Sequence, residues 1–226
     1  MNWSIRLEKI IGIDNLNKLN NTHVLIVGIG GVGGICLEMI ARCGIGNITI
    51  CDYDVFEESN LNRQILCLKE NIGEYKTLVA KKRINSINQD INVNIINNKI
   101  DEDILNSLLN IDYIIDACDD INAKVLLVKY ALNNNIKIIS CCGTGNRTNP
   151  SKLEISNIWK TSYDPLAKKL RSYLRKEKIN YKLPVVYSKE QPIIKTDRYV
   201  GSISLVPNSA GILLASYVVN DIIKEN

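Results

Sequence analysis

The sequence predicts an α/β fold: a Rossmann-like, doubly wound and mainly parallel sheet, with added strands and a helix at the C-terminal end. Two observations lead to this prediction. Short apolar segments alternate with helical apolar patterns over residues 1–150, and the first of these segments is followed by a glycine-rich turn. The length of 226 residues suits one sizeable core and leaves little room for a second independent domain. We therefore expect a single domain over residues 1–226.

The elements of the core, residues 1–150, are expected in alternating order. A helix over about 4–20 precedes the first strand, 23–28 (HVLIVG), whose apolar, β-branched run is typical of a buried parallel strand. Further strands are expected near 48–51, 91–96, 112–117 and 136–141, where similar apolar runs recur. Helices are expected near 34–43, 60–67, 75–88, 101–109 and 121–134, between these strands.

The alternation changes in the extension, residues 151–226. A strand near 153–158 leads to a basic helix, which Asp164 and Pro165 open as an N-cap and N1 pair. A tyrosine-rich loop, a strand near 184–188 and a last helix over about 208–222 follow. We expect the added strands in either orientation and a mobile loop between 176 and 202. The last helix can pack on the sheet or at a dimer interface.

A nucleotide-binding turn follows the first strand. Gly28, Gly30 and Gly33 have the G-x-G-x-x-G spacing between a strand and a helix, so backbone N–H groups and the helix N-terminus can approach a phosphate. Asp52 follows Gly28 by 24 residues at the end of the next strand, where an acid can hold ribose hydroxyls. Such glycines can also serve close helix–strand packing alone, but the strand–helix context favours nucleotide binding.

Polar side chains near this turn favour a triphosphate over a dinucleotide. Asn60 and Arg63 share a face of the expected helix, and Lys76 follows, so a guanidinium and an ammonium can meet the phosphates. Asp119 ends another strand at the same edge of the sheet. Taken singly, Arg63 and Lys76 could be solvated helix residues, and Asp119 or Asp120 could be a helix N-cap. Their common position after successive strands favours a shared site.

These segments resemble a known family. GIGGVGG, DYDVFEESNLNRQ, GEYK and DACDD together are similar to the ATP-dependent adenylating family that includes ThiF, MoeB and the ubiquitin-activating enzymes. That family activates a carboxylate as an acyl-adenylate. The resemblance implies a ThiF-type adenylating domain with ATP and Mg²⁺ as cofactors. The ATP-binding residues that it implies are Gly28, Gly30, Gly31, Gly33, Asp52, Asp54, Asn60, Arg63, Gln64, Lys76 and Asp119.

The resemblance also implies a role for each catalytic residue. Arg63 and Lys76 would bind the triphosphate and stabilise charge that develops at the α-phosphate. Asp119 would position the magnesium-bound phosphates and is the metal-binding residue. Arg6 resembles the arginine that family members insert into the neighbouring subunit's site, which implies a homodimer.

The cysteines argue against two features that are common in this family. The chain has seven, at positions 36, 43, 51, 67, 118, 141 and 142, and none forms a C-x-x-C pair. A four-thiolate zinc site is therefore not expected. No cysteine follows Cys142, so a thioester nucleophile in the C-terminal third is not expected either. Cys141 and Cys142 are predicted to be small buried residues.

The C-terminal third resembles one subfamily. CCGTGNRTNPSKLEISNIWKTSYDPLAKKLRSYLRK, VVYSKEQP and GSISLVPNSAGILLASYVVNDII are similar to the tRNA threonylcarbamoyladenosine dehydratases. The resemblance implies that ATP activates the threonyl carboxylate of a modified adenosine beside the anticodon. A nitrogen of the same modification then closes a ring, with net loss of water. The alternative is adenylation of the C-terminal Gly-Gly of a ubiquitin-like sulfur-carrier protein, as in ThiF and MoeB.

The charge pattern is compatible with a tRNA partner. Residues 160–182 carry eight Lys or Arg and two acids, although the net charge of the whole chain is only +4. A basic helix can bind phosphates, but a solvated surface helix is the common alternative. Arg147 could contact RNA or substrate, or belong only to its glycine-rich turn. The predicted tRNA-binding residues are Arg147, Lys168, Lys169, Arg171 and Arg175.

Other functional classes fit less well. The only histidine, His23, begins the first strand, and no tyrosine has a lysine four residues later, so the acid–base groups common in dehydrogenases are absent. The sequence contains no Walker A motif, so a P-loop NTPase is not expected. We expect a cytoplasmic protein, because no signal peptide is recognised and an odd number of cysteines suits a reducing cytosol. DNA is not expected as a partner. The apolar stretch 210–219 is too short for a membrane span. A monovalent cation and a sulfur-transfer (cysteine desulfurase) partner are left open.

Overall fold

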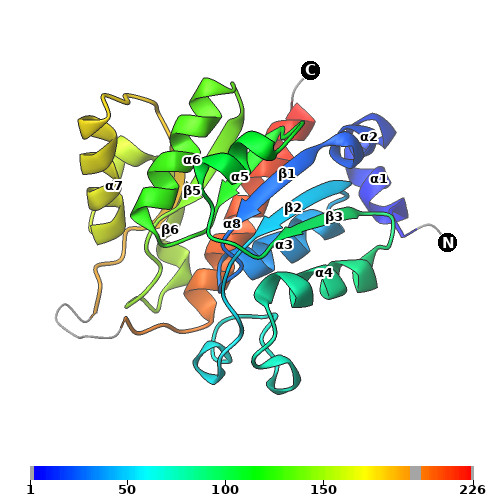
Figure 1. The fold of residues 1–226 in the computed structure, drawn as a ribbon, viewed down its shortest axis with the longest axis horizontal. Helices are drawn as coiled ribbons and strands as arrows, with labels where there is room; N and C mark the ends of the chain where they lie inside the picture. Colours follow the sequence, from blue (N-terminus) through cyan, green and yellow to red (C-terminus); the bar gives the residue numbers. More distant parts are fainter. Residues whose placement is uncertain (1–2, 194–199, 225–226) are drawn as a thin grey trace.

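The computed structural model describes residues 3–193 and 200–224, and a seven-stranded sheet lies at the centre of this part of the chain (Figure 1). Its order is β3-β2-β1-β4-β5-β7-β6. Neighbouring strands are parallel except for β6, which pairs with β7 in antiparallel orientation. The predicted doubly wound, mainly parallel sheet with added C-terminal strands is therefore confirmed. The strands are β1 (His23–Val27), β2 (Asn47–Cys51), β3 (Asn92–Ile96), β4 (Tyr113–Asp116), β5 (Lys137–Cys141), β6 (Leu153–Asn157) and β7 (Pro184–Ser188).

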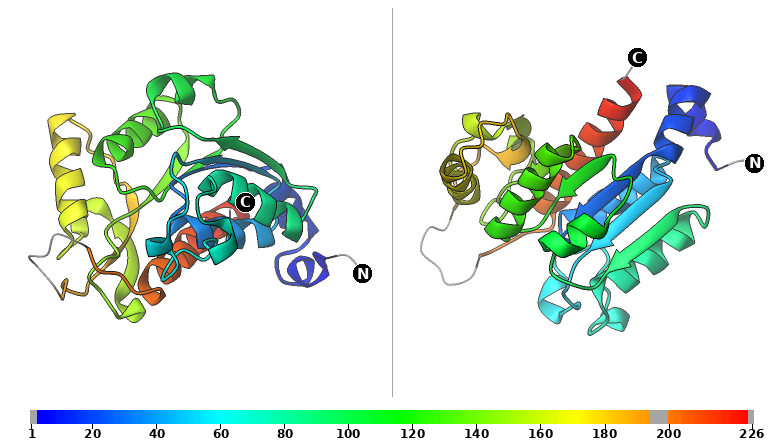
Figure 2. Two further views of the ribbon diagram at one scale, coloured as in Figure 1. Left: turned by 60° about the horizontal axis from the view of Figure 1, so that its bottom comes forward. Right: turned by 45° about the horizontal axis from the view of Figure 1, so that its top comes forward.

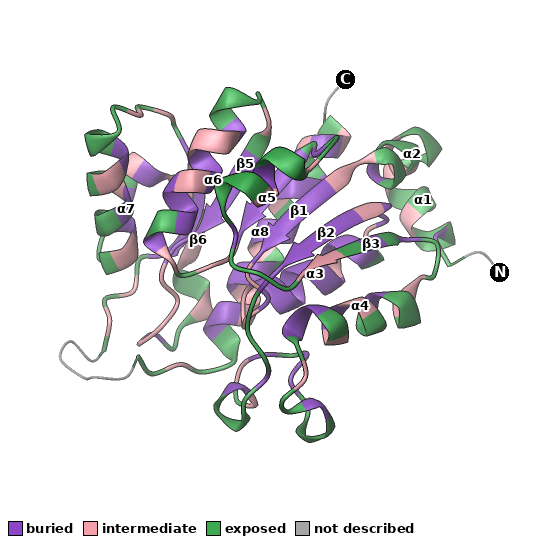
Figure 3. Ribbon diagram, viewed as in Figure 1, coloured by how far each residue is buried: buried purple, intermediate pink, exposed green. Residues whose placement is uncertain are grey.

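Helices cover both faces of the sheet (Figures 1 and 2). One apolar core holds side chains of α2 (Ile13–Asn21), α3 (Gly33–Arg42), α4 (Lys76–Ile87) and α8 (Leu205–Lys224). The other core holds side chains of α5 (Glu102–Ser107), α6 (Ile121–Asn133) and α7 (Pro165–Lys176). Residues of β1 alternate between the cores: Val24 and Ile26 face the first, and Leu25 and Val27 the second. The central strands are accordingly buried on both faces, as Figure 3 shows.

The predicted N-terminal helix over 4–20 is instead two helices, α1 (Ile5–Ile11) and α2. Gly12 separates them with φ 79° and ψ 161°. This conformation lies outside the helical region, and glycine adopts it without a steric penalty because it has no Cβ. The apolar pattern was therefore sufficient to predict helix on both sides of Gly12 but not the break between them.

The predicted helix over 60–67 is wrong. The chain forms two single 3₁₀ turns, η1 (Glu58–Asn60) and η2 (Lys69–Asn71), with non-helical turns between them. Asn60 and Asn71 explain the difference, because each side-chain oxygen accepts a hydrogen bond from a backbone N–H three residues earlier, at 3.2 Å and 2.8 Å. Such side-chain bonds offer the backbone an alternative to helical hydrogen bonds.

The last helix is longer than predicted and spans Leu205–Lys224. By length and composition alone it is the one helix in the described residues that could cross a membrane. In the structure it packs against α3 and the sheet, and its residues Ala210, Leu214 and Val218 are buried in the first core. The contact with α3 is close, because a Cβ at Gly211 would collide with the backbone oxygen of Val32.

The predicted mobile loop over 176–202 is not one loop, because β7 lies within it. Residues 194–199 of this range lie outside the described residues. Two further 3₁₀ turns complete the extension, η3 (Pro150–Lys152) before β6 and η4 (Ile158–Lys160) after it. The extension thus adds β6, β7, α7 and α8 to the same sheet and cores rather than forming a separate unit.

Candidate functional site

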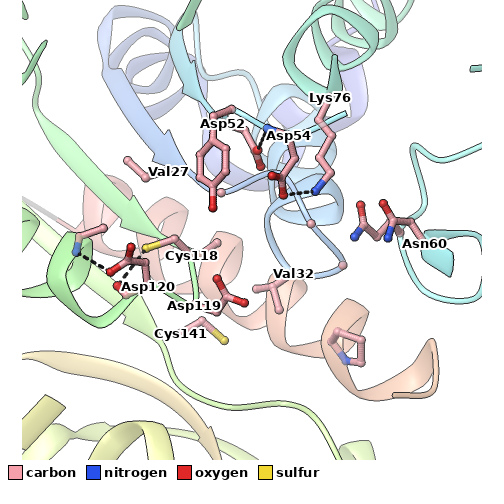
Figure 4. Close-up of a pocket in the computed structure, with 18 of the residues that line it drawn as sticks. Val27, Val32, Asp52, Asp54, Asn60, Lys76, Cys118, Asp119, Asp120 and Cys141 are labelled. Carbon is pink, nitrogen blue, oxygen red and sulfur yellow. Dashed lines mark hydrogen bonds and ion pairs between the residues drawn. The ribbon is translucent and has the colours of Figure 1, made fainter. Parts of the chain in front are cut away.

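A cavity of about 780 Å³ opens at the carboxyl ends of β1, β2, β4 and β5 (Figure 4). The chain leaves β1 toward β2 and β3 on one side, and β4 and β5 lie on the other side. Ligands of open α/β sheets bind at such a switch point. All of the predicted ATP-binding residues except Gly33 line this cavity.

The glycine turn forms the floor of the cavity, and its glycines serve two purposes. Gly28 has φ +91°, and a Cβ there would lie 2.8 Å from the backbone nitrogen of Cys118. A Cβ at Gly33 would collide with the backbone oxygen of Gly28, so this glycine permits close packing of α3 on β1. Gly30 differs, because a Cβ there would contact only the Gln64 amide at 3.8 Å. Packing does not require Gly30, and its missing side chain leaves the space open to a ligand.

Asp52 connects the glycine turn to the loop after β2. Its side chain is buried, and its two oxygens accept hydrogen bonds from the backbone N–H groups of Ile29 at 2.6 Å and Asp54 at 2.9 Å. These bonds hold the carboxylate at the cavity wall, at the end of β2, where the sequence places a ribose-binding acid.

Cationic and amide side chains line the cavity on the side of residues 54–76. Lys76 is 6% exposed, and its ammonium lies 2.8 Å from the Asp54 carboxylate. Arg63 is half-buried, lines the cavity and donates to the Ser59 carbonyl at 2.7 Å. Figure 4 shows Lys76 and Asn60 on this side. Asn60 and Arg63 both line the cavity as predicted, but turns place them there and not the helix that was expected over 60–67.

Gln64 provides an unpaired acceptor in the cavity. The side chain is buried, and its oxygen has no hydrogen-bond partner among the described residues. A buried polar atom without a partner costs free energy, on the order of 1–3 kcal/mol. A polar ligand that donates a hydrogen bond to Gln64 would remove this cost.

Two carboxylates follow β4 and differ in their surroundings. Asp119 is exposed and points toward the cavity (Figure 4). Asp120 caps α6 by accepting from the backbone N–H of Asn122 at 2.7 Å and forms an ion pair with Lys99 at 2.5 Å. Of the two N-cap candidates, Asp120 is thus the cap, and Asp119 is left facing the cavity.

A metal ion would depend on the nucleotide for most of its ligands. In the part of the chain that the structure describes, no group of three or more His, Cys, Asp or Glu could hold a metal ion. Mg²⁺ usually binds through one or two carboxylates together with substrate phosphates. The exposed carboxylate of Asp119 fits that type of site.

The remaining predicted site residues lie away from the cavity lining. Arg6 is exposed on α1. On α7, Lys168 and Lys169 are exposed, whereas Arg171 donates to the carbonyls of Ile158 and Thr161 at 3.2 Å and 3.3 Å. Arg175 lies over the Trp159 ring, 5.4 Å from its centroid. An RNA contact by the four α7 residues stays a prediction, and so does the insertion of Arg6 into the site of a neighbouring subunit.

Arg147 is a buried part of the fold, with 3% of its surface exposed. Its guanidinium donates to the carbonyls of Gly143 at 2.8 Å, Gly145 at 3.1 Å, Tyr163 at 3.1 Å and Glu190 at 3.1 Å. Of the roles considered for Arg147, the structure supports an organising role in its glycine-rich turn.

Sequence reasoning missed a buried polar network below the cavity. Lys124 of α6 is fully buried, and its ammonium lies 2.9 Å from Asp116, 3.1 Å from the Ser140 hydroxyl and 2.7 Å from the Cys141 carbonyl. It therefore joins the carboxyl ends of β4 and β5. The sequence did carry one signal for this network: Lys124 falls on the apolar face of the helix INAKVLLVKYALN, where a charged side chain would need a buried partner.

Cys141 and Cys142, two of the cysteines that line the cavity, are unsuited to nucleophilic attack. Burial raises the pKa of Cys141 to about 12, and burial also raises the pKa of Cys142 well above its usual value. The thiolate is the reactive form of cysteine, so very little of it is present at neutral pH. We expect Cys141→Ala and Cys142→Ala to retain turnover within about threefold of the wild type. Measured turnover that falls by a hundredfold or more in either variant would contradict this.

Comparison with known proteins identifies the family. The family model described as the ThiF family matches residues 2–215, nearly the whole chain. This chain belongs to the ThiF family. The tRNA threonylcarbamoyladenosine dehydratase of Bacillus subtilis (strain 168) is 34% identical to it over 239 residues, which cover 97% of this chain and 94% of that protein.

Solved structures give the same result for this ThiF-family protein. The Escherichia coli tRNA N6-threonylcarbamoyladenosine dehydratase, TcdA, in complex with AMP matches it with a TM-score of 0.91 and 30% identity, over 96% of this chain and 92% of that chain. The same enzyme in complex with ATP matches with a TM-score of 0.90, 30% identity and the same coverage. The resemblance drawn from the sequence is thereby confirmed.

Proposed function

We propose that this protein is an ATP-dependent tRNA threonylcarbamoyladenosine dehydratase. One observation carries the proposal: a single cavity joins the glycine turn, Asp52 and the cationic group of Arg63 and Lys76. Such a cavity can hold ATP with its triphosphate against positive charge. Relatives with this name match nearly the entire chain, including its C-terminal extension, which supports the choice of substrate.

The chemistry has two steps. First, an oxygen of the threonyl carboxylate attacks the α-phosphorus of ATP, the bond to the bridging oxygen breaks, and pyrophosphate leaves. Second, a nitrogen of the same modification attacks the acyl carbon and loses its proton, and AMP leaves with the former carboxylate oxygen. The products are a ring, AMP and pyrophosphate, so the nucleoside loses one water. The enzyme needs no thioester, in agreement with the buried thiols of Cys141 and Cys142.

The protein contributes positioning and electrostatic stabilisation. Asp54 holds the Lys76 ammonium at the cavity, and the Arg63 guanidinium lies on the same side. Both cations can neutralise negative charge as it develops on the α-phosphate and pyrophosphate. Mg²⁺ bound with ATP would supply further charge neutralisation at the phosphates, and Asp119 is the residue that would hold it.

We further propose a homodimer in the cytoplasm. Arg6 is exposed on α1 and does not line the cavity of its own chain, so only a second copy could bring an equivalent residue to it. The exposed Lys168 and Lys169 of α7 are proposed to contact phosphates of tRNA. A tRNA substrate agrees with a cytoplasmic location.

The test is a single-turnover assay on modified tRNA. We expect purified protein with ATP, Mg²⁺ and tRNA bearing threonylcarbamoyladenosine to yield a nucleoside lighter by one water after digestion. The mass change should require ATP and should be accompanied by release of AMP and pyrophosphate. A mass that stays unchanged, with protein shown to bind ATP, would reject the proposal and direct attention to a Gly-Gly-terminated carrier protein.

A further inference from the structure

The cavity extends beyond the residues that suit a nucleotide. Past Asp119 and the end of β5 it is lined by Gly143, Thr144, Gly145, Leu166, Val200 and Ser202, which we call the β5-side lobe. These residues come from three separate segments: the turn after β5, the first turn of α7, and the chain just before α8. None of them carries a charge, and none belongs to the predicted ATP-binding set.

Arg147 holds the β5-side lobe in shape. Two of its four carbonyl acceptors, Gly143 and Gly145, belong to the turn after β5. The other two are Tyr163, just before α7, and Glu190, just after β7. The Asp164 carboxylate lies 3.7 Å from the same guanidinium and caps α7 by accepting from the backbone N–H of Ala167 at 2.9 Å. One buried side chain therefore fixes the turn after β5 relative to the start of α7 and the end of β7.

Asn146 binds the third segment of the lobe, the chain just before α8, to the turn after β5. Its backbone N–H donates to the Gly201 carbonyl at 2.7 Å, and its side-chain oxygen accepts from the Gly201 N–H at 2.7 Å. Its own carbonyl accepts from the Ile193 N–H at 2.8 Å. Val200 packs against the turn at Gly145, where a Cβ would collide with it. Hydrogen bonds and close packing within the chain thus hold the segment before α8 against the turn after β5.

The geometry of phosphoryl transfer predicts from which side of the cavity the carboxylate reaches the α-phosphorus. The attacking and leaving oxygens lie roughly in line at the transferred phosphorus. The groups suited to pyrophosphate, Lys76 and Asn60, lie on one side of Asp119, and Cys141 at the end of β5 lies on the other side (Figure 4). An attacking carboxylate must therefore approach from the β5 side.

We propose that the β5-side lobe receives the carboxylate-bearing substituent of the substrate nucleoside, with Arg147 and Asn146 as positioning residues. This inference rests on the proposed function. The reacting carboxylate faces the phosphate, so the part of the substituent left in the lobe is an uncharged urea and hydroxyl. The hydroxyls of Thr144 and Ser202, the backbone of two glycines and the apolar Leu166 suit such a group. The lobe determines which carboxylate reaches the α-phosphate.

The main test fills the β5-side lobe with a bulky side chain and leaves the predicted ATP-binding residues, which we call the nucleotide side, unchanged. We expect Thr144→Phe to lower kcat/KM for modified tRNA by about tenfold or more, because the substituent loses its place, with ATP affinity within about twofold of wild type. Leu166→Trp adds bulk to the lobe from α7 and should give the same result if Thr144→Phe does not fold. Ser86→Phe on the exposed surface of α4 is the matched control and should behave as wild type.

Arg147→Lys tests the positioning role. It keeps a positive charge but cannot reach four carbonyls, so the turn after β5 should loosen. We expect KM for modified tRNA to rise by about fivefold or more while the ATP dissociation constant is unchanged, because the nucleotide side does not contain this residue. A purely structural role would instead lower ATP affinity and tRNA turnover together.

The outcomes separate this inference from the proposed function. Wild-type protein that turns over modified tRNA, with Thr144→Phe or Leu166→Trp equally active, would overturn the lobe assignment alone. Loss of ATP affinity in parallel with turnover would also overturn it, because the lobe would then belong to the nucleotide site. Wild-type protein that binds ATP and leaves the modified nucleoside unchanged would overturn the proposed function and this inference with it.

Discussion

Replacing Lys76 with alanine is expected to lower turnover by about 10²-fold or more while the protein stays folded. The Lys76 side chain is almost completely buried and lines the cavity where the triphosphate would bind, and its ammonium lies 2.8 Å from Asp54. In such a site, shielded from water, a positive charge stabilises developing negative charge more strongly than it would in bulk solvent. The measurement is AMP formation from ATP and modified tRNA at saturating substrate.

Arg63→Ala is expected to have an effect of the same size, because Arg63 lines the same side of the cavity. The matched control is Lys82→Ala on α4, the helix that begins at Lys76. Lys82 is exposed and pairs with Glu74, so its loss should change turnover by less than about twofold. Near-normal turnover in both Lys76→Ala and Arg63→Ala, with folding verified by circular dichroism, would show that the assignment of the phosphate site is wrong.

Lys124→Met is expected to destabilise the protein by about 3–5 kcal/mol, because it leaves the Asp116 carboxylate buried without its counter-charge. Both side chains are fully buried and lie 2.9 Å apart. Burial alone lowers the pKa of Lys124, but the charge and hydrogen bond of Asp116, together with the nearby thiols of Cys118 and Cys142, outweigh burial and raise that pKa above its usual value. A lysine with a raised pKa stabilises the fold at all pH values below its unfolded pKa, and this contribution is lost only as the pH rises through the folded pKa. The pair therefore acts throughout the neutral range.

Urea unfolding followed by circular dichroism measures this effect. Adding Asp116→Asn to Lys124→Met should recover much of the lost stability, because it removes the buried charge that has no partner. Lys129→Met is the matched control on α6, since Lys129 forms a half-exposed pair with Glu177 and should cost less than about 1 kcal/mol. Equal midpoints for Lys124→Met and Lys129→Met would refute the role given to the buried pair.

The parts of the fold with regular periodicity were predictable from the sequence. The five strands of the core and the helices α3, α4, α5 and α6 lie within two or three residues of the predicted ranges. Each repeats an apolar pattern with the period of its element, and both faces of the sheet are covered. The segment 60–67 failed because the side chains of Asn60 and Asn71 bind the backbone, and an apolar pattern does not register such bonds.

The nucleotide side of the cavity was predictable for a related reason. Its residues follow strand ends or turns, and parallel strands bring their carboxyl ends to one edge. The β5-side lobe was not predictable, since Gly143, Leu166 and Val200 meet only through hydrogen bonds of Arg147 and Asn146 between distant segments. The sequence grouped Arg147 with Lys168 and Lys169 as a predicted tRNA contact, and only the structure shows that Arg147 is buried whereas the two lysines are exposed.

The sequence by itself determined the sheet, the position of the nucleotide turn and the family, because apolar periodicity and short motifs are local properties of the chain. The tertiary structure alone decided how charged residues are used. It separated Asp120, which caps α6, from Asp119, which faces the cavity, and it placed Lys124 in the core and Arg147 behind the β5-side lobe. The physical reason is that the role of a charge depends on its solvent exposure and on partners from other segments.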